Sequence, residues 1–303
     1  MLRIRFINVG DGDAILIEER AGEFCFRMLV DTGRAEDPAC ADFLRRANIA
    51  HLDKLVITHL HADHIGGMSS MLGQVSVSEL ISGYIPLLPG AQAPADPRAD
   101  KSIRNMIACL NRFSADAAAM KAAGTRMVEL FASWHGVRLS DKLSADFIVP
   151  DVRALRLQRE VWNRMLEPRS VSEAKMEQAS KKRNPNSLRI RLRYAGREIE
   201  LAGDCYAEVW EKGDPAPCDI FKLPHHGGDR SVTDLLLSKL KPAHAVICCD
   251  RTADSGRPTP RTLEKLKKSG AKIWYTDGPD AKHSWSCADF AILEDGSILY
   301  PKN

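Results

Sequence analysis

"THLHADHIGGM", residues 58–68, places three of the chain's nine histidines and one aspartate within six consecutive positions. The five residues KLVIT, 54–58, end at the first residue of this stretch and form a short apolar run that predicts a buried strand. The polar cluster therefore follows a strand end, and the two glycines after it let the backbone bend closely. Loops held by a rigid scaffold are common places for functional side chains.

The spacing of the four polar side chains predicts a metal site. Alternate residues of an extended chain point to the same side, so His59 and His61 can share one metal ion. Asp63 and His64 follow as the chain turns, and this pair can face a second ion beside the first. Imidazole and carboxylate ligands suit Zn²⁺, Mn²⁺ or Fe²⁺.

Two later clusters offer the further ligands that two metal ions need. Asp204 ends the apolar stretch ELAGD, and His225 with His226 follows the apolar stretch DIFKLP. Each cluster also stands at the end of a predicted strand. The HADH motif alone would be compatible with a polar turn that contains incidental histidines. The three clusters together favour a metal centre.

The composition is that of an ordinary soluble globular protein, with 44% hydrophobic and 27% charged residues among 303. No apolar run approaches the roughly 20 residues of a membrane helix, and the start MLRIRFINVG has no signal-peptide pattern. We therefore expect a cytoplasmic protein without a membrane segment. The eight cysteines are scattered without a CxxC pair, which predicts reduced thiols.

Strand and helix patterns alternate along the chain and predict an α/β layered fold with its site on strand-end loops. Prolines and a glycine at 89–97 indicate a linker, and the apolar residues after it recur at helical spacing. We expect a single domain over 1–303 with a mostly helical insertion at 98–182. The predicted strands are 2–6, 13–19, 25–33, 54–58, 187–194, 197–204, 218–224, 243–250 and 271–277, and helices are predicted from residue 37 and at 260–269.

The net charge is only +3, but it is unevenly distributed. The segment from Arg153 to Arg197 holds thirteen Lys or Arg and four Glu, a local balance of +9, which leaves −6 for the rest of the chain. A solvated helix face and a surface for an anionic partner such as nucleic acid explain this run equally well.

The sequence resembles the metallo-β-lactamase fold superfamily and, more narrowly, the soluble hydrolase domain of the ComEC/Rec2 competence proteins and their free-standing relatives. The resemblance covers both ends of the chain but not 98–182. It implies a four-layer αββα sandwich with metals at one edge. The matching stretches are INVGDGDAILI, LVDTG, LDKLVITHLHADHIGGM, NPNSLRIRL, ELAGD, DIFKLPHHGG and YTDG.

The resemblance also implies roles for the residues that match its motifs. His59 and His61 would bind the first metal ion, Asp63 and His64 the second, and Asp204 would bridge the two. One histidine of the later pair would ligate the second ion, with His226 favoured, and His225 would face the substrate. Two aspartates and an asparagine would brace the site: Asp13, Asp31 and Asn184.

Two departures from the superfamily pattern bear on metal and substrate. The stretch RNPNSL has Asn184 where most members carry a ligand histidine, which weakens the first metal site or favours Mn²⁺. The ComEC-like branch also has asparagine there. In GRPTP, 256–260, Arg257 stands where that branch often has histidine, and an arginine can hold a phosphate.

Two divalent ions, Zn²⁺ or Mn²⁺, can hold a hydroxide between them, so we expect a metal-dependent hydrolase, foremost a phosphodiesterase or nuclease. Asp63 would orient the hydroxide, and His225 would contact a phosphoryl oxygen or protonate the leaving alkoxide. The alternatives are a small-molecule ester, lactone or thioester hydrolase of the same fold, and a non-catalytic binding module. Lys222 is expected to face solvent. Candidate contacts to nucleic acid or another phosphodiester are Arg257, Lys181, Lys182 and Arg183.

Overall fold

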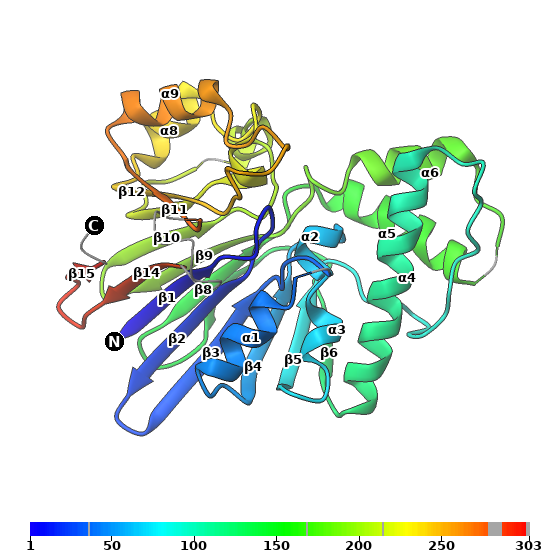
Figure 1. Cartoon of the computed structure of the whole chain (residues 1–303), viewed down its shortest axis with the longest axis horizontal. Coiled ribbons are helices and arrows are strands. Elements are labelled where there is room, and N and C mark those ends of the chain that lie inside the picture. The colour runs from blue at the N-terminus through cyan, green and yellow to red at the C-terminus, as the bar shows by residue number, and fades with distance from the viewer. Residues whose placement is uncertain (36, 168, 214, 278–286, 301–303) are drawn as a thin grey trace.

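Two mixed β-sheets face each other and form the inner layers of the protein (Figure 1). The computed structural model describes residues 1–35, 37–167, 169–213, 215–277 and 287–300. In strand order, the first sheet consists of β15 (Ile298–Leu299), β14 (Cys287–Ile292), β1 (Leu2–Ile7), β2 (Ile15–Ala21), β3 (Phe24–Val30), β4 (His51–Ile57), β5 (Ser76–Ser82) and β6 (Arg126–Glu129). The second consists of β13 (Lys272–Tyr275), β12 (His244–Ile247), β11 (Ile220–Lys222), β10 (Arg197–Leu201), β9 (Arg189–Tyr194), β8 (Ser144–Ile148) and β7 (Trp134–Arg138).

The space between the sheets is filled by alternate residues of their strands. Leu2, Ile4 and Phe6 of β1 are fully buried there, and Ile190 and Leu192 of β9 meet them from the opposite sheet. This is the period of two that an extended chain gives to its side chains. The alternation read from the sequence is therefore confirmed, and it produces the central core.

Helices cover the outer face of each sheet, which confirms the predicted αββα sandwich. A second apolar cluster lies between the first sheet and its helices, and a third lies between the second sheet and its helices. The first sheet is covered by α1 (Ala39–Arg46), α2 (Ala62–Ile65), α3 (Met68–Met71), α4 (Lys101–Ala122), α5 (Val152–Leu166) and α6 (Glu173–Lys181). The second is covered by α7 (Ala207–Trp210), α8 (Asp234–Leu240) and α9 (Pro260–Ser269).

The interpretation of 98–182 as one helical insertion needs correction. Three helices do lie in this range, and they stand together at one side of the molecule (Figure 1). Between α4 and α5, however, β6 extends the first sheet at its edge, and β7 and β8 extend the second. Residues 126–148 therefore belong to the sandwich. The chain therefore crosses from the first sheet to the second within 98–182, the range predicted to be an insertion. The assignment of 1–303 to a single domain stays a prediction.

The first strand, β1, lies next to β14, the second last of the described strands, in the first sheet. β1 pairs antiparallel with β14, with Leu2 opposite Ile292 and Phe6 opposite Ala288, and on its other side with β2. β14 was not predicted from the sequence. Strand β1 is thus an inner strand of its sheet, completed by a segment from the far end of the chain.

The strand order brings the predicted site residues to one edge of the sandwich. β3, β4 and β5 run parallel in one sheet, and β10, β11 and β12 run parallel in the other. The carboxyl ends of parallel strands meet at a common edge, where α/β proteins bind ligands. Among the described residues no helix has the length and apolar character needed to cross a membrane. The cysteines with described side chains are free, as expected.

Candidate metal centre

The THLHADHIGGM loop leaves β4 and turns directly into α2. His59 follows the end of the strand, His61 precedes the first residue of the helix, and Asp63 and His64 lie within its single turn. The predicted shared direction of His59 and His61 is confirmed, because Nε2 of His59 lies 2.8 Å from Nδ1 of His61. Gly67 is required for this turn, since a Cβ there would lie 2.1 Å from the carbonyl oxygen of Thr32.

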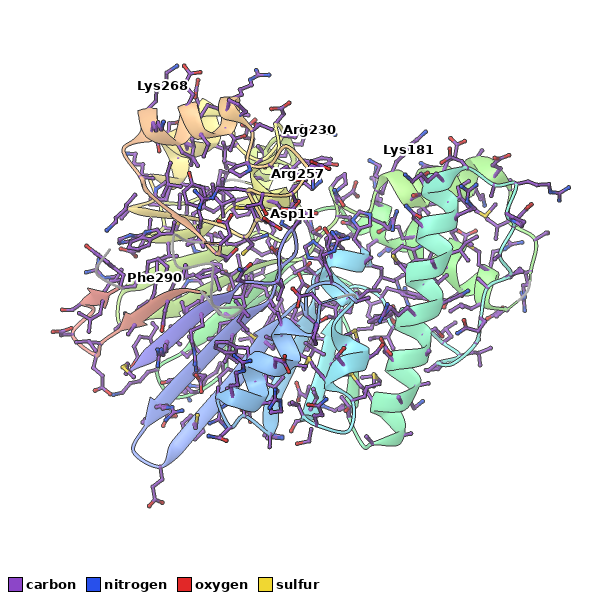
Figure 2. All side chains as sticks on the ribbon, in the orientation of Figure 1. Asp11, Lys181, Arg230, Arg257, Lys268 and Phe290 are labelled. Atoms are coloured by element: carbon purple, nitrogen blue, oxygen red, sulfur yellow. The ribbon has the colours of Figure 1, made fainter. Side chains whose placement is uncertain are left out.

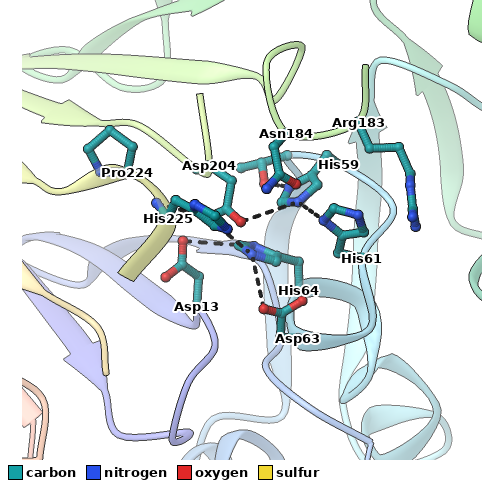
Figure 3. Close-up of polar contacts among 12 residues, drawn as sticks. Asp13, His59, His61, Asp63, His64, Arg183, Asn184, Asp204, Pro224 and His225 are labelled. Carbon is teal, nitrogen blue, oxygen red and sulfur yellow. Dashed lines mark hydrogen bonds and ion pairs between the residues drawn. The ribbon is translucent and has the colours of Figure 1, made fainter. Parts of the chain in front are cut away.

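Asp204 lies between two groups of imidazoles (Figure 3). Its Oδ2 is 3.7 Å from His59 Nε2, and its Oδ1 is 3.4 Å from His64 Nε2 and 3.7 Å from His226 Nε2. The two oxygens of one carboxylate thus face different groups, as a bridging ligand would. The predicted convergence of the three sequence clusters is confirmed. The two groups with metal-ligand spacing are His59, His61 and Asp204, and Asp63, His64, Asp204 and His226.

Buried atoms without hydrogen-bond partners point to the same two positions. Within the described part of the chain, His64 Nε2 and His226 Nε2 are buried and have no partner, and neither has Asn184 Oδ1. A buried polar atom without a partner is costly unless something fills the site. Imidazole nitrogens and carboxylate oxygens are ligands that divalent transition metals accept. The donor set therefore fits a metal centre.

The opposite ring nitrogens of two ligand candidates are held by hydrogen bonds. His64 Nδ1 lies 2.7 Å from Asp31 Oδ2, and His226 Nδ1 lies 2.9 Å from the carbonyl oxygen of Cys248. Asp31 also accepts hydrogen bonds from the backbone and the hydroxyl of Thr58, at 2.8 and 2.7 Å. Such bonds fix the ring orientation and leave Nε2 for the metal. The contacts of Asp31 are therefore those expected of a residue that braces the site.

The buried carboxylates of the site favour positive charge beside them. Burial alone would lower the pKa of His64, but the carboxylates of Asp204, Asp31 and Asp63 raise it well above its usual value. Burial also opposes ionisation of Asp204, whose pKa is nevertheless held well below its usual range by His64 and His226. Cations are therefore favoured here, and a metal ion would displace the proton from His64.

Lys222 overturns the expectation that it faces solvent. Its side chain is 0% exposed, its Nζ forms an ion pair with Asp13, and it donates to the carbonyl oxygen of Gly203 at 3.0 Å. β11 is an inner strand with both faces covered, so no residue of it reaches water. Asp13 also lies 3.7 Å from His226 Nδ1. The pair places a positive charge beneath the ligands, and sequence reasoning missed it.

The two adjacent histidines differ in their environment. His226 is fully buried in the second ligand group, whereas His225 lies outside both groups, 5.6 Å from the Tyr206 ring between centroids. Both residues have a positive φ, near 50°, so the chain reverses sharply here. Burial lowers the pKa of His225 to about 4, with Arg257 contributing to the shift. His226 thus has the geometry expected of the ligand. His225 is a neutral imidazole at neutral pH.

The residues predicted to contact substrate do not lie together. Arg183 is 5% exposed beside His61 and donates from Nη1 to the carbonyl oxygen of Leu60 at 3.1 Å. Arg257 lies beside His225 on the opposite flank. Lys181 points to solvent and pairs with Glu177, and Lys182 lines a separate cavity. Of these four candidates, Arg183 and Arg257 thus lie beside the site, and the contact of all four with a substrate stays a prediction.

Asn184 lies beside the first ligand group, with its Nδ2 3.4 Å from the hydroxyl of Tyr206 (Figure 3). Of the motif YTDG, the residues up to Asp277 are described. Its glycine, 278, lies outside the described residues. Asp277 binds Arg251 through a bidentate contact at 2.9 and 3.1 Å, away from the ligand groups.

One family of proteins matches part of the chain. A model of the metallo-beta-lactamase superfamily matches residues 7–101, which include THLHADHIGGM and the strands β2 to β5. The match thus covers about a third of the chain and includes four of the six residues in the two ligand groups: His59, His61, Asp63 and His64.

Two particular proteins show how distant its known relatives are. The chain is 21% identical over 297 residues to ComE operon protein 3 of Bacillus subtilis (strain 168). That alignment covers 90% of this chain and 32% of the relative, so the chain spans about a third of the relative's length. The crystal structure of Zn²⁺-bound PqqB from Methylobacterium extorquens aligns over 99% of both chains with a TM-score of 0.50 and 10% identity. A likeness at this identity concerns the fold.

Proposed function

We propose that the protein hydrolyses phosphodiester bonds with two divalent metal ions, Zn²⁺ or Mn²⁺, held by the two ligand groups that share Asp204. Such ions would supply Lewis-acid activation of water and of the phosphoryl group. The observation that carries the choice of phosphate is a pair of arginines, Arg183 and Arg257, on opposite flanks of the ligands. Among the described residues neither forms an ion pair with a carboxylate.

Arg183 places a positive charge beside the first ligand group. Burial lowers the pKa of His61 to about 3, and the charge of Arg183 is the next largest cause. Its guanidinium donates to the carbonyl oxygens of Leu60 and Ser180 rather than to a carboxylate. The charge is therefore available to an anionic substrate, whereas a neutral ester or lactone has no use for it.

Arg257 supplies the second charge. Its guanidinium lies close to His225 and Gly228, and Figure 2 shows it near Arg230 on the lobe that faces the helical side of the molecule. Guanidinium groups match phosphate oxygens with paired donors. Two such groups on opposite sides of the ligands favour nucleic acid or another phosphodiester as the substrate.

Two side chains and one backbone N–H of the site have defined tasks in this proposal. Asp63 is partly open to solvent, with its Oδ2 3.3 Å from His226 Nε2, and orients the attacking water. His225 donates a hydrogen bond to a phosphoryl or leaving oxygen, because its low pKa leaves it neutral at pH 7. The backbone N–H of His225 donates to Asp204 Oδ1 at 3.1 Å and keeps that carboxylate in place.

The experiment is a substrate panel on metal-loaded protein. We expect turnover of bis(p-nitrophenyl) phosphate and of DNA or RNA, loss of that turnover with EDTA, and its return with Zn²⁺ or Mn²⁺. The variant Asp63→Asn should retain the fold and lose turnover by about 10²–10⁴-fold, the usual contribution of a positioned acid or base. The matched control is Asp229→Asn, since Asp229 is exposed and follows the histidine loop without joining a ligand group.

Other outcomes would contradict the proposal. Metal-dependent cleavage of a lactone, a thioester or a carboxylic ester without phosphodiester turnover would identify a small-molecule hydrolase. Metal binding without turnover of any of these substrates would favour a binding module. An equal loss in Asp63→Asn and Asp229→Asn would remove the role given to Asp63.

A further inference from the structure

A cavity of about 390 Å³ lies near the metal centre, between the start of α5, the segment 182–189 and the segment that follows α7. Three basic side chains line it: Lys182, Arg189 and Lys212. The one carboxylate among its described lining residues belongs to Asp151, which is already engaged as the N-cap of α5. The described walls of the cavity are therefore electropositive.

The guanidinium of Arg189 is buried in this wall, and two of its nitrogen atoms have no hydrogen-bond partner among the described residues. The residue is 6% exposed, and its Nε and Nη1 have no partner within the described ranges of the chain. Its guanidinium stacks on the ring of Trp210, 4.0 Å from the centroid. A buried guanidinium normally has every donor satisfied, because an unpaired buried charge is costly. The stacking holds the group in place but leaves its donors for a ligand.

The nearest carboxylate does not satisfy Arg189. Glu200 acts on it through its charge, but the two side chains form no ion pair, and Glu200 Oε1 accepts from Arg191 Nη1 at 2.9 Å. Burial raises the pKa of Glu200 to about 7, so at neutral pH this side chain is only partly ionised. Lys182 and Lys212 also form no ion pair with described residues.

Two segments of chain run from the metal centre to the cavity. Asn184 lies beside the first ligand group, and the next two residues, Pro185 and Asn186, line the cavity. Tyr206 binds Asn184 through its hydroxyl, and the same segment reaches the cavity at Val209. The cavity therefore adjoins the metal centre without sharing its ligands.

We propose that this cavity binds a phosphate group of a nucleic-acid strand, next to the phosphodiester that lies at the metal centre. The inference rests on the proposed function, since it takes the substrate to be a phosphodiester. Phosphate oxygens accept the paired N–H donors of Arg189, and the two lysines add charge at the rim. The site would position the strand and would not take part in bond cleavage.

The test measures binding rather than turnover. A fluorescent phosphorothioate oligothymidylate is titrated with the metal-loaded protein at several NaCl concentrations, and affinity is followed by anisotropy. For a single-stranded ligand, the slope of log K against log salt decreases in magnitude by about 0.7 for each phosphate contact removed. We expect the double variant Lys182→Gln/Lys212→Gln to bind more weakly, with the slope reduced by about 0.7 or more. Arg189→Gln should do the same.

The matched control is Lys175→Gln. Lys175 lies in the same basic segment, pairs with Glu160 at 3.3 Å and does not line the cavity. It should keep the wild-type slope. An unchanged slope in the lysine double variant, or an equal reduction in Lys175→Gln, would overturn the inference. If Arg189→Gln fails to fold, the lysine double variant still tests the inference. If the wild-type protein does not hydrolyse bis(p-nitrophenyl) phosphate, only the proposed function is overturned. The salt slopes still test the cavity, because they are measured from binding and not from turnover.

Discussion

The metal centre and the basic segment 153–197 both stand out in the sequence, but they differ in how far the sequence explains them. At the metal centre, residue identity and spacing already specify the geometry, because four of the ligand candidates lie on one strand-to-helix turn. In the basic segment, the sequence shows the charges but not their partners. Those partners come from elsewhere in the chain.

Ion pairs with carboxylates outside the basic segment offset part of its local excess of +9. Arg159 binds Glu129, Arg193 binds Asp146 and Arg197 binds Asp219, all of which lie outside the segment. The charges that remain for a ligand are few and lie at defined places, such as Arg183 and Arg189. A charge count thus identifies an excess, whereas the fold decides which charges are available.

The largest expected effect is at the carboxylate that both ligand groups share. Asp204→Asn removes a charge that faces both groups, so metal content after dialysis should fall from two ions to none, and turnover to background. Elemental analysis with circular dichroism measures both occupancy and fold. Full retention of one ion in the variant would contradict the bridging position of Asp204.

The next effect concerns the buried pair beneath the ligands. Lys222→Met leaves the Asp13 carboxylate buried without its partner, so the free energy of unfolding should fall by about 3–5 kcal/mol. Urea denaturation of the metal-free protein measures this. The double variant Lys222→Met/Asp13→Asn should recover part of the loss, because it removes the unpaired charge. A single-variant loss below about 1 kcal/mol would mean that the pair is not buried as a unit.

The smallest effect belongs to the ion pairs of the basic segment. Hydrogen bonds from Arg193, at 2.9 and 2.6 Å, hold the pKa of Asp146 below its usual range. A folded-state pKa below the unfolded-state pKa of about 3.9 stabilises the protein at pH values above 3.9. This stabilisation is lost as the pH falls through the folded-state pKa. Asp146→Asn should therefore cost about 1 kcal/mol or less at pH 7, and less still at pH 3. Equal losses at both pH values, by urea denaturation, would exclude this ion pair as the cause.

Period-two patterns and strand-end motifs predicted a layered α/β fold with a metal site on strand-end loops, and the family resemblance implied the αββα sandwich and the ligand roles. They did not reveal β14, whose apolar pattern CADFAI is short and lies far from its partner strand. They also failed at 126–148, where β6, β7 and β8 were read as part of an insertion. Short edge strands have weak periodicity, so tertiary pairing rather than local preference decides them.

The site residues that sequence reasoning missed are those whose role depends on burial. Lys222 resembles any lysine of a strand until the opposite sheet and the outer helices cover the two faces of β11. Arg189 was counted only as part of a basic run, yet it differs from Arg191 and Arg193 beside it, because no carboxylate of a described residue forms an ion pair with it. No local signal separates these three arginines, since their partners are set by the sheet register.

The pairing of β1 with β14 also constrains how the protein is made. On a ribosome the strand Leu2–Ile7 emerges before its neighbour Cys287–Ile292, because the two are separated by most of the sequence. Until both have been made, one edge of β1 has unpaired backbone groups, and the inner core lacks Phe290 and Ile292. Contacts this distant in sequence slow folding and leave a nascent sheet edge open to other chains. The open edge of β1 is therefore a place where the nascent chain can pair with the wrong partner.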